Sequence, residues 1–437
     1  MPFWLLQGKA GFKARVSNHI SLAVHTLVYQ DELLDYLTQQ KRNGRSLWLA
    51  TATHRSIAEA VAAHLGIFDG VFASNAQFNL NGQHKAQALI EKFGDKGFVY
   101  AANAHVDLKV WRHAAAAIVV NADTALANAA AKLCEVESVI PAPKSQGLLF
   151  KLLRAMRIYQ WVKNLLVFAA LILSHSIGQP GLVLLSVLAF FSFSFAASCI
   201  YVINDLVDLD ADRIHPLKRH RVFAAGILPL YWGAILVPLL LLASLTIAWY
   251  INPLFLAAVL AYVIVTTAYS FYLKRFALLD VFSLTSLYTL RIIAGALAIS
   301  VAVSYWLLAF SMFIFLSLAL AKRYMELYNL KQQTAGKQVT RGYHVDDLQV
   351  VGLFGISSGY LSVMVTVLYI HDLQADALYT HPVWLWAVAL AILYWITRLW
   401  LLTYRGELHE DPVIFAINDR PSYVIMLICA LALFMAL

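Results

Sequence analysis

The sequence predicts an all-α bundle of about nine transmembrane helices, preceded by a soluble α/β domain. Of 437 residues, 61% are hydrophobic and 13% are charged, whereas a soluble domain is roughly 45–50% apolar and about 25% charged. The excess is uneven, because long apolar runs recur only from about residue 165 to the last residue. We therefore divide the chain into an α/β head (1–135), a linker with a membrane-surface helix (136–163) and a membrane body (164–437).

The head is predicted from alternating patterns between residues 46 and 134. Short apolar runs, SLWLATAT, GVFAS, FVYAANA and AAIVVNA, alternate with helix-like segments at 56–66, 85–94, 107–113 and 124–134. Such alternation is typical of a parallel sheet with crossover helices. The first residues lack the sustained apolar core and the small-residue cleavage site of a signal peptide. We therefore expect the head to stay in the cytoplasm.

The membrane body contains nine apolar runs that could cross a bilayer, which takes about 20 residues with a range of about 17 to 25. They lie near 164–179, 182–203, 228–250, 254–273, 278–300, 304–321, 349–370, 383–403 and 421–437. The first and the last are the weakest, since both are short and the first is interrupted by SHS.

Lys and Arg gather on alternate connections between these runs. The connections around 177–181, 250–253, 300–304 and 371–382 contain none, and the opposite connections carry nearly all of them. The positive-inside rule therefore places the basic loops and the N-terminus in the cytoplasm and the C-terminus outside, in an inner (cytoplasmic) membrane. The net charge of +8 lies in membrane-edge loops, which favours contact with anionic lipid and not nucleic acid as a partner.

An acidic motif follows the second apolar run. If the helix continues, Asp205, Asp208 and Asp212 share one face, and Asn204 lies one turn before Asp208. Such a stripe is costly at a membrane edge unless cations neutralise it, and carboxylates suit Mg²⁺ that is completed by substrate phosphates. Bases that could meet phosphate oxygens come next: His215, Lys218, Arg219, His220 and Arg221. The pattern predicts a diphosphate bridged by Mg²⁺; the alternative is a solvated loop whose charges pair with one another.

The arrangement N-D-x-x-D-x-x-x-D after the second of nine spans resembles the first signature of the UbiA superfamily of intramembrane prenyltransferases. The continuation HPLKRHRVFAAG differs from the Arg-Thr-x-x-Arg-Pro tract of aromatic prenyltransferases. It is similar to the polyprenyl-phosphate phosphoribosyltransferase branch, with Val222 in place of a proline. The segments RIYQWVKN (157–164) and AKRYMEL (321–327) also fit that branch.

The resemblance implies a Mg²⁺-dependent transferase that stabilises a leaving diphosphate. The branch takes phosphoribosyl diphosphate as donor and a polyprenyl phosphate as acceptor. The alternative is transfer of a prenyl group from a polyprenyl diphosphate to an aromatic acceptor such as 4-hydroxybenzoate. A third class, a transporter with acidic ion ligands, predicts polar residues across the membrane, whereas here nearly all charge lies on one side.

The second half of the site is expected on YSFYLKRFALLDVF (269–282), where the family's second Asp-x-x-x-Asp motif is reduced to Asp280. Arg291 shares a helix face with Asp280 and lies inside a span, where an arginine is costly and is a functional hypothesis. The alternative for Arg291 is a structural pair with Asp280 or Glu326. Later candidates are Asp411 and Asp419, as site residues or as loop caps, and, more weakly, Tyr343 and His344.

The site residues implied by motif and resemblance fall into two groups. Catalytic roles are expected for Asp205, Asp208, Asp212, Asp280 and Arg291, of which the first three would bind Mg²⁺. Binding of the diphosphate-containing donor is expected from Asn204, Lys163, His215, Lys218, Arg219, Arg221, Lys274, Lys322 and Arg323.

Details of the head resemble the haloacid-dehalogenase (HAD) phosphatase fold. Thr51, Lys85, Asn103 and Asp107 match its later motifs, with Asn103 in place of a metal-binding aspartate. The Asp-x-Asp pair that supplies nucleophile and general acid in that fold does not occur before residue 46. Either the first strand precedes this sequence or the head is a non-catalytic relic; we expect a head without catalysis.

Overall fold

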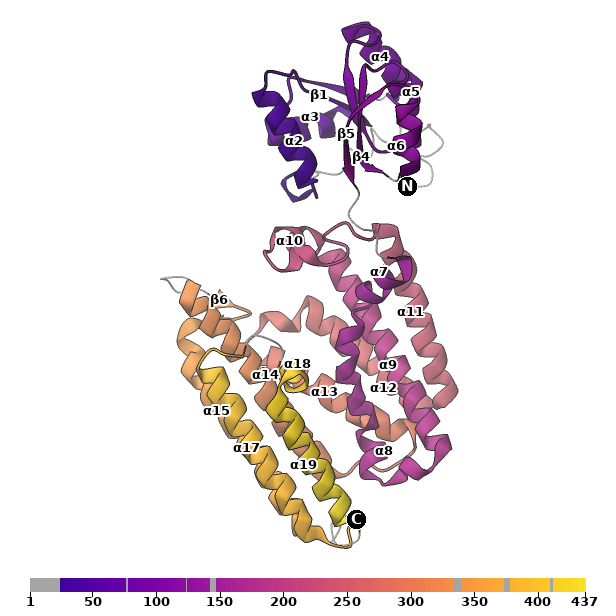
Figure 1. Ribbon diagram of the computed structural model, residues 1–437. Coiled ribbons are helices and arrows are strands. Elements are labelled where there is room, and N and C mark those ends of the chain that lie inside the picture. Colours follow the sequence, from indigo (N-terminus) through magenta and orange to yellow (C-terminus); the bar gives the residue numbers. More distant parts are fainter. Residues whose placement is uncertain are drawn as a thin grey trace. The chain divides into compact units, whose positions relative to one another are not determined.

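The computed structural model describes residues 24–75, 78–122, 124–141, 147–333, 339–372, 378–408 and 412–437. They form two compact units (Figure 1). The head unit contains the described residues up to Lys151 together with Asp208–Leu228, and the membrane unit contains Leu152–Val207 and Pro229–Leu437.

The head unit is an α/β structure with parallel strand pairs. Its strands are β1 (Trp48–His54), β2 (Gly70–Ser74), β3 (Val99–Ala102), β4 (Ala116–Ala122) and β5 (Glu135–Pro141). Its helices are η2 (Val24–Thr26), α2 (Asp31–Arg42), α3 (Arg55–Leu65), α4 (Gln83–Phe93), η3 (His105–Asp107), α5 (Leu108–Trp111), α6 (Thr124–Ala131), α10 (Leu209–Ile214) and η6 (Lys218–His220). Strand β1 pairs with β2, and β4 lies between β3 and β5 in a second sheet. The predicted alternation of strands and helices is confirmed.

Strand β4 has buried side chains on both faces of its sheet. Side chains alternate along a strand, so Ala117 and Val119 pack against residues of α4, α5 and α6. Ile118 and Val120 face the other way and pack with Leu33 of α2. A parallel strand buried on both faces reads as a continuous apolar run, as AAIVVNA does.

One expectation about the linker is wrong at its start. The predicted linker begins at residue 136, but Glu135–Pro141 forms β5 and pairs with β4 in parallel. The segment is an edge strand with exposed charged residues and a terminal proline, a composition that edge strands share with loops.

The membrane unit is almost entirely helical. Its elements, with α7 leading in, are α7 (Leu148–Ala155), η4 (Ile158–Phe168), α8 (Ala169–Leu173), η5 (Ser176–Gly178), α9 (Pro180–Val207), α11 (Leu230–Ile251), α12 (Pro253–Phe271), η7 (Leu273–Arg275), α13 (Leu279–Ala298), α14 (Tyr305–Gln333), β6 (Val339–Thr340), β7 (Tyr343–His344), η8 (Val345–Asp347), α15 (Leu348–Ile370), η9 (Pro382–Trp384), α17 (Leu385–Tyr404), α18 (Pro412–Asn418) and α19 (Arg420–Ala436).

Seven helices of the described chain are long and apolar enough to cross a membrane, so the prediction of nine spans is confirmed for seven. The first predicted span is not one straight helix, because Leu148–Ala155 and Ile158–Leu173 meet at a bend of 56° and count as an eighth span only if taken together. The last predicted span is α19, which has 17 residues and lies at the lower limit for crossing.

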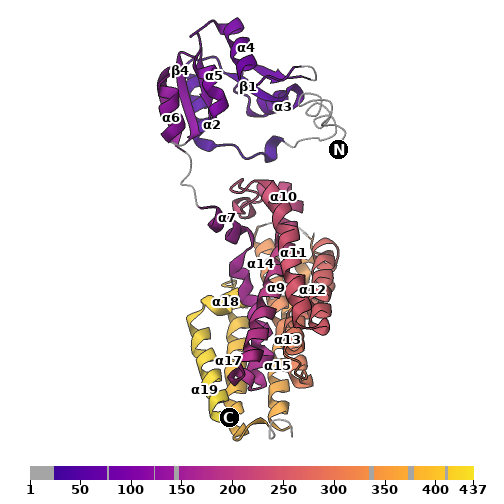
Figure 2. The same cartoon turned by 90° about the vertical axis from the view of Figure 1, so that its right-hand side faces the viewer.

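Helix packing in the membrane unit forms two neighbouring apolar cores. One joins α9, α11, α12 and α13 around Phe193 and Phe255, and the other joins α13, α14, α15 and α17 around Phe315 and Trp400. Helix α19 runs beside α17 in both views (Figures 1 and 2). Since α13 contributes to both cores, residues on this helix are buried between the two groups of helices.

Candidate functional site

The end of α9 places Asn204 and Asp205 at the edge of the membrane unit. Asp205 is 3% exposed, and the Arg157 guanidinium donates to its Oδ1. Arg157 lies at the 56° bend and has φ 52°, a left-handed conformation that is uncommon outside glycine. Asn204 Nδ2 donates to Ser270 Oγ at 3.0 Å, which joins α9 to α12. The Arg157–Asp205 ion pair therefore ties the bend between α7 and η4 to the end of α9.

The expected helical stripe of aspartates is wrong, because the helix breaks at Asp208. Helix α9 ends at Val207 and α10 begins at Leu209, while Asp208 lies between them with φ −87° and ψ 12°. A continuous helix is what puts positions i, i+3 and i+7 on one face. The carboxylates of Asp205 and Asp212 thus lie on different elements.

The remainder of the motif belongs to the head unit. Asp212 is 1% exposed and accepts a bond from Arg221 Nη1 at 2.5 Å. The His215 ring accepts from the backbone N–H of Leu217 and Lys218 at 3.2 and 3.3 Å, which closes the turn after α10. Four bases here have exposed side chains: His215, Lys218, Arg219 and His220. Part of the predicted self-paired loop is therefore real, since Asp212 pairs with Arg221 and Arg213 Nη1 lies 3.8 Å from Asp210 Oδ1, while the four bases named above are exposed.

Three lysines assigned to donor binding lie in the membrane unit. Lys163 is on η4, Lys274 is on η7 and Lys322 is on α14, and each is half-buried.

Arg291 lies deep in the membrane unit, where it is 5% exposed. Its Nε donates to Asn164 Oδ1 at 2.8 Å and its Nη2 to Tyr262 OH at 3.1 Å. The predicted alternative of a pair with Asp280 or Glu326 is wrong, because those two carboxylates bind another arginine.

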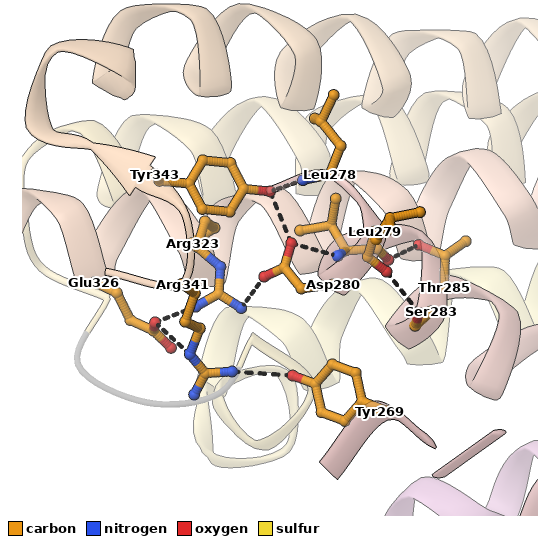
Figure 3. Close-up of polar contacts among 11 residues, drawn as sticks. Tyr269, Leu278, Leu279, Asp280, Ser283, Thr285, Arg323, Glu326, Arg341 and Tyr343 are labelled. Atoms are coloured by element: carbon orange, nitrogen blue, oxygen red, sulfur yellow. Dashed lines mark hydrogen bonds and ion pairs between the residues drawn. The ribbon is translucent and has the colours of Figure 1, made fainter. Parts of the chain in front are cut away.

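That other arginine is Arg323, which joins α13 to α14 (Figure 3). Its Nη2 lies 2.6 Å from Asp280 Oδ2, and both side chains are 0% exposed. Its Nη1 contacts Glu326 one turn further along α14. Asp280, expected to act in catalysis, and Arg323, expected to bind the donor, are thus each other's counter-ions.

The chain before α15 completes this cluster. Tyr343 OH donates to Asp280 Oδ1 and accepts from Leu278 N, both at 2.8 Å. Burial raises the pKa of Tyr343 above its ordinary value, and its bond to Asp280 acts in the same direction, so the phenol stays a donor. Arg341 lies 3.6 Å from Glu326 and donates to Tyr269 OH at 3.1 Å (Figure 3). These contacts tie the segment to α12, α13 and α14.

Asp419 is a structural cap. It accepts two bonds from Arg398, at 2.7 and 3.0 Å, and two more from Ser422 at the start of α19. Burial opposes ionisation, but the bonds from Arg398 and Ser422 outweigh it and hold the pKa of Asp419 below its ordinary value. Of its two proposed roles, the structure supports the cap. Asp411 lies outside the described residues.

In the head unit, two of the residues that match HAD motifs meet. Lys85 lies 3.6 Å from Asp107, and Tyr100 bridges them, accepting from Lys85 at 2.8 Å and donating to Asp107 at 3.2 Å. Burial lowers the pKa of Lys85, which the charge of Asp107 opposes. Thr51 Oγ1 accepts instead from Thr53 N within β1. The sequence offered no reason to expect Tyr100 in this position.

Three residues of the membrane unit hold predicted site residues, although Arg157 and Asn164 are not predicted as site residues and Tyr343 is predicted only weakly. Arg157 binds Asp205, Asn164 binds Arg291, and Tyr343, expected only weakly, binds Asp280. Arg157 and Asn164 belong to the RIYQWVKN segment that resembles the family, but the direction of their side chains depends on the bend after α7.

The donor chemistry of the acidic motif fits a hard divalent cation, because it consists of carboxylate and amide oxygens. Two of the carboxylates already have an arginine counter-ion. Within the part of the chain that the structure describes, no three His, Cys, Asp or Glu side chains form a ligand set.

The chain is similar in sequence to several known proteins. A protein of Sinorhizobium fredii, y4nM, is 35% identical over 438 residues, which cover 100% of this chain and 84% of that protein. The decaprenyl-phosphate phosphoribosyltransferase of Mycolicibacterium smegmatis is 38% identical over 207 residues, 46% of this chain and 64% of the relative. The solved structure of a UbiA homolog from Archaeoglobus fulgidus bound to GPP and Mg²⁺ superposes with a TM-score of 0.49 and 17% identity, over 65% of this chain and 98% of that one. Residues 165–435 match the UbiA prenyltransferase family, and since this is more than half of the chain, the protein belongs to that family, as an integral multi-pass membrane protein of the intramembrane prenyltransferase type.

Proposed function

We propose that this protein transfers the phosphoribosyl group of phosphoribosyl diphosphate to a polyprenyl phosphate. A phosphate oxygen of the acceptor forms a bond to C1 of the ribose as the bond from C1 to the diphosphate breaks, and pyrophosphate leaves with the electron pair. The similarity to the decaprenyl-phosphate phosphoribosyltransferase of M. smegmatis carries this proposal. The chain spans 64% of that relative.

The basic tract supports the donor side of the reaction. Lys218 and Arg219 are exposed in η6, directly after the acidic motif in the chain. Point charges and planar guanidinium groups are the side chains that bind phosphates. A donor with a diphosphate and a 5-phosphate presents more anionic groups than a prenyl diphosphate, and a cluster of exposed bases suits it.

The acidic motif would hold Mg²⁺ through Asp205, Asp208 and Asp212. When bound, Mg²⁺ would neutralise charge on the leaving diphosphate. Arg157 and Arg221 orient Asp205 and Asp212 by charged hydrogen bonds.

Orientation and head activity are part of the proposal. We place the basic loops and the head unit on the cytoplasmic side of the inner membrane, where a water-soluble donor is available.

We also propose that residues 1–135 form a HAD-like domain without catalysis, in which Lys85, Tyr100 and Asp107 stabilise the fold.

The second candidate is prenyl transfer to an aromatic acid; the description of the matched family favours a prenyl donor. The two differ in the donor. The test is transfer of label from phosphoribosyl diphosphate to butanol-extractable lipid by the purified full chain, with polyprenyl monophosphate and Mg²⁺. We expect a labelled lipid that chelator abolishes.

Two variants sharpen the assay. Asp208→Asn should abolish labelling, whereas Lys331→Gln, which removes an exposed charge at the end of α14, should not change it. No labelled lipid in the wild type, with prenylation of 4-hydroxybenzoate by the same preparation, would reject phosphoribosyl transfer in favour of the second candidate.

A further inference from the structure

Arg291 differs in its partners from Arg323, the other buried arginine of the described membrane unit, and from the half-buried Arg157 and Arg398. Arg157, Arg323 and Arg398 each bind a carboxylate. Among the described residues, Arg291 instead binds the amide oxygen of Asn164, the phenol of Tyr262 and the carbonyl of Leu287. The rings of Tyr262 and Tyr288 lie 4.9 and 5.3 Å from its Cζ. All of these groups are neutral.

A buried cation without a counter-ion is costly, most of all inside a membrane. Hydrogen bonds to neutral acceptors and aromatic faces reduce this cost but do not cancel the charge. A guanidinium has five N–H donors, and three are used in the contacts with described residues. Two donors and the whole positive charge are left for an anion that does not belong to these residues.

The depth of Arg291 indicates which anion this is. Along α13, Arg291 follows Asp280 by 11 residues, or about 16 Å at 1.5 Å per residue. On α12, Ser270 marks the level of Asn204, because the two side chains are hydrogen-bonded. Tyr262, which binds Arg291, precedes Ser270 along the helix by about 12 Å at the same rise per residue. The guanidinium is therefore well inside the span, away from the helix ends that carry Asn204 and Asp280. An anion carried on a lipid chain can reach this depth more readily than a soluble sugar phosphate.

We infer that Arg291 is the receptor for the anionic head group of the acceptor. Resting on the proposed function, the acceptor is a polyprenyl monophosphate, whose phosphate would accept the two remaining N–H groups. A carboxylate of an aromatic acid offers the same chemistry. The assignment of an anionic acceptor therefore does not depend on the phosphoribosyl donor.

The surroundings of Arg291 hold the guanidinium in one orientation. Asn164 is itself fixed by a bond from its Nδ2 to Ser194 Oγ at 3.0 Å. One turn after Arg291, a Cβ on Gly295 would lie 2.0 Å from Val167 O, so only glycine lets η4 approach α13 this closely. Fixed donors bind an anion without a further loss of side-chain entropy.

The first experiment measures binding of two probes to the full chain in detergent micelles. The probes are a polyprenyl monophosphate and the polyprenol of the same length, titrated by the shift of the thermal unfolding midpoint. We expect the wild type and the control Lys331→Gln to prefer the phosphate, and Arg291→Gln to lose about tenfold or more in affinity for the phosphate alone. An unchanged preference in folded Arg291→Gln would overturn the inference.

A second variant, Asn164→Asp, tests the role of Arg291 even if Arg291→Gln does not fold. Asn164→Asp supplies an internal carboxylate beside Arg291 Nε, which should stabilise the empty protein and compete with an external anion. We expect its affinity for the phosphate probe to fall about tenfold or more, with unchanged affinity for the polyprenol. If Arg291 has only a structural role, Asn164→Asp will keep the full preference for the phosphate, which would reject the proposal.

The two proposals fail in different ways. If the wild type ignores polyprenyl monophosphate but binds 4-hydroxybenzoate in an Arg291-dependent manner, the receptor assignment holds and phosphoribosyl transfer is rejected. If labelled lipid forms from phosphoribosyl diphosphate while Arg291→Gln and Asn164→Asp retain wild-type acceptor KM, the function holds and the receptor assignment is rejected.

Discussion

Removing Arg323 should destabilise the membrane unit more than removing any one of its partners. Arg323 and Asp280 are both 0% exposed and 2.6 Å apart. Arg323→Met leaves the Asp280 carboxylate buried with its bonds from Val281 N and Tyr343 OH but without the cation that contacts it. Breaking a buried pair in this way costs about 3–5 kcal/mol, and the two remaining donors place this case at the lower end. At about 2 °C per kcal/mol for a unit of this size, the unfolding midpoint should fall by about 6 °C.

The assay is thermal unfolding of the purified full chain in one detergent at one scan rate, because unfolding of large proteins is often irreversible. Glu326→Gln is the matched control; its side chain is 32% exposed, so we expect a shift within about 2 °C. The double variant Asp280→Asn with Arg323→Met removes both charges and keeps an acceptor for Val281 and Tyr343. It should recover at least half of the loss. A shift within about 2 °C for Arg323→Met, or a double variant less stable than Arg323→Met, would refute the reasoning.

Three further predictions concern the metal motif, helix packing and pH. Asp205→Ala should abolish turnover while the protein still inserts and purifies, and near-normal activity at limiting Mg²⁺ would contradict the metal assignment. Gly295→Ala should destabilise by about 1–3 kcal/mol, because its Cβ would lie 2.0 Å from Val167 O; an unchanged unfolding midpoint would show that η4 moves freely. Because the folded pKa of Asp419 is lowered, its ionisation stabilises the fold above the unfolded value of about 4 and the contribution is lost as the pH falls below it. Asp419→Asn should therefore flatten the acid limb of a plot of unfolding midpoint against pH, and an equally steep limb would exclude Asp419 as its source.

Much of the architecture could be predicted because the deciding signals are local. A span is a run of some 20 apolar residues, and a parallel strand is a short apolar run between helix patterns, so seven spans and the first four strands of the head were found. Strand β5 was missed because its exposed charges and terminal proline also suit a linker.

The side-chain network depends on contacts that no local pattern encodes. Asp280 and Arg323 are 43 residues apart, and Tyr343 reaches Asp280 from 63 residues away. The break at Asp208 is another example, because the segment D-L-D-A-D contains neither proline nor glycine. The residue types predict a site of acidic and basic side chains, but the choice of counter-ions depends on helix packing.

The bend before η4 limits how residue 157 can vary during evolution. Its backbone has φ 52°, which favours Gly, Asn or Asp, whereas the neighbouring Asp205 requires a cation. No residue type satisfies both preferences, since the side chains that relax the backbone are uncharged or negative and the cationic ones are strained there. A lineage that lost the charge at this position would relax the backbone at residue 157 but would lose the ion pair that orients the Asp205 carboxylate. Replacement of Arg157 by glycine or asparagine in a relative would therefore mark a chain in which the acidic motif has taken on a different role.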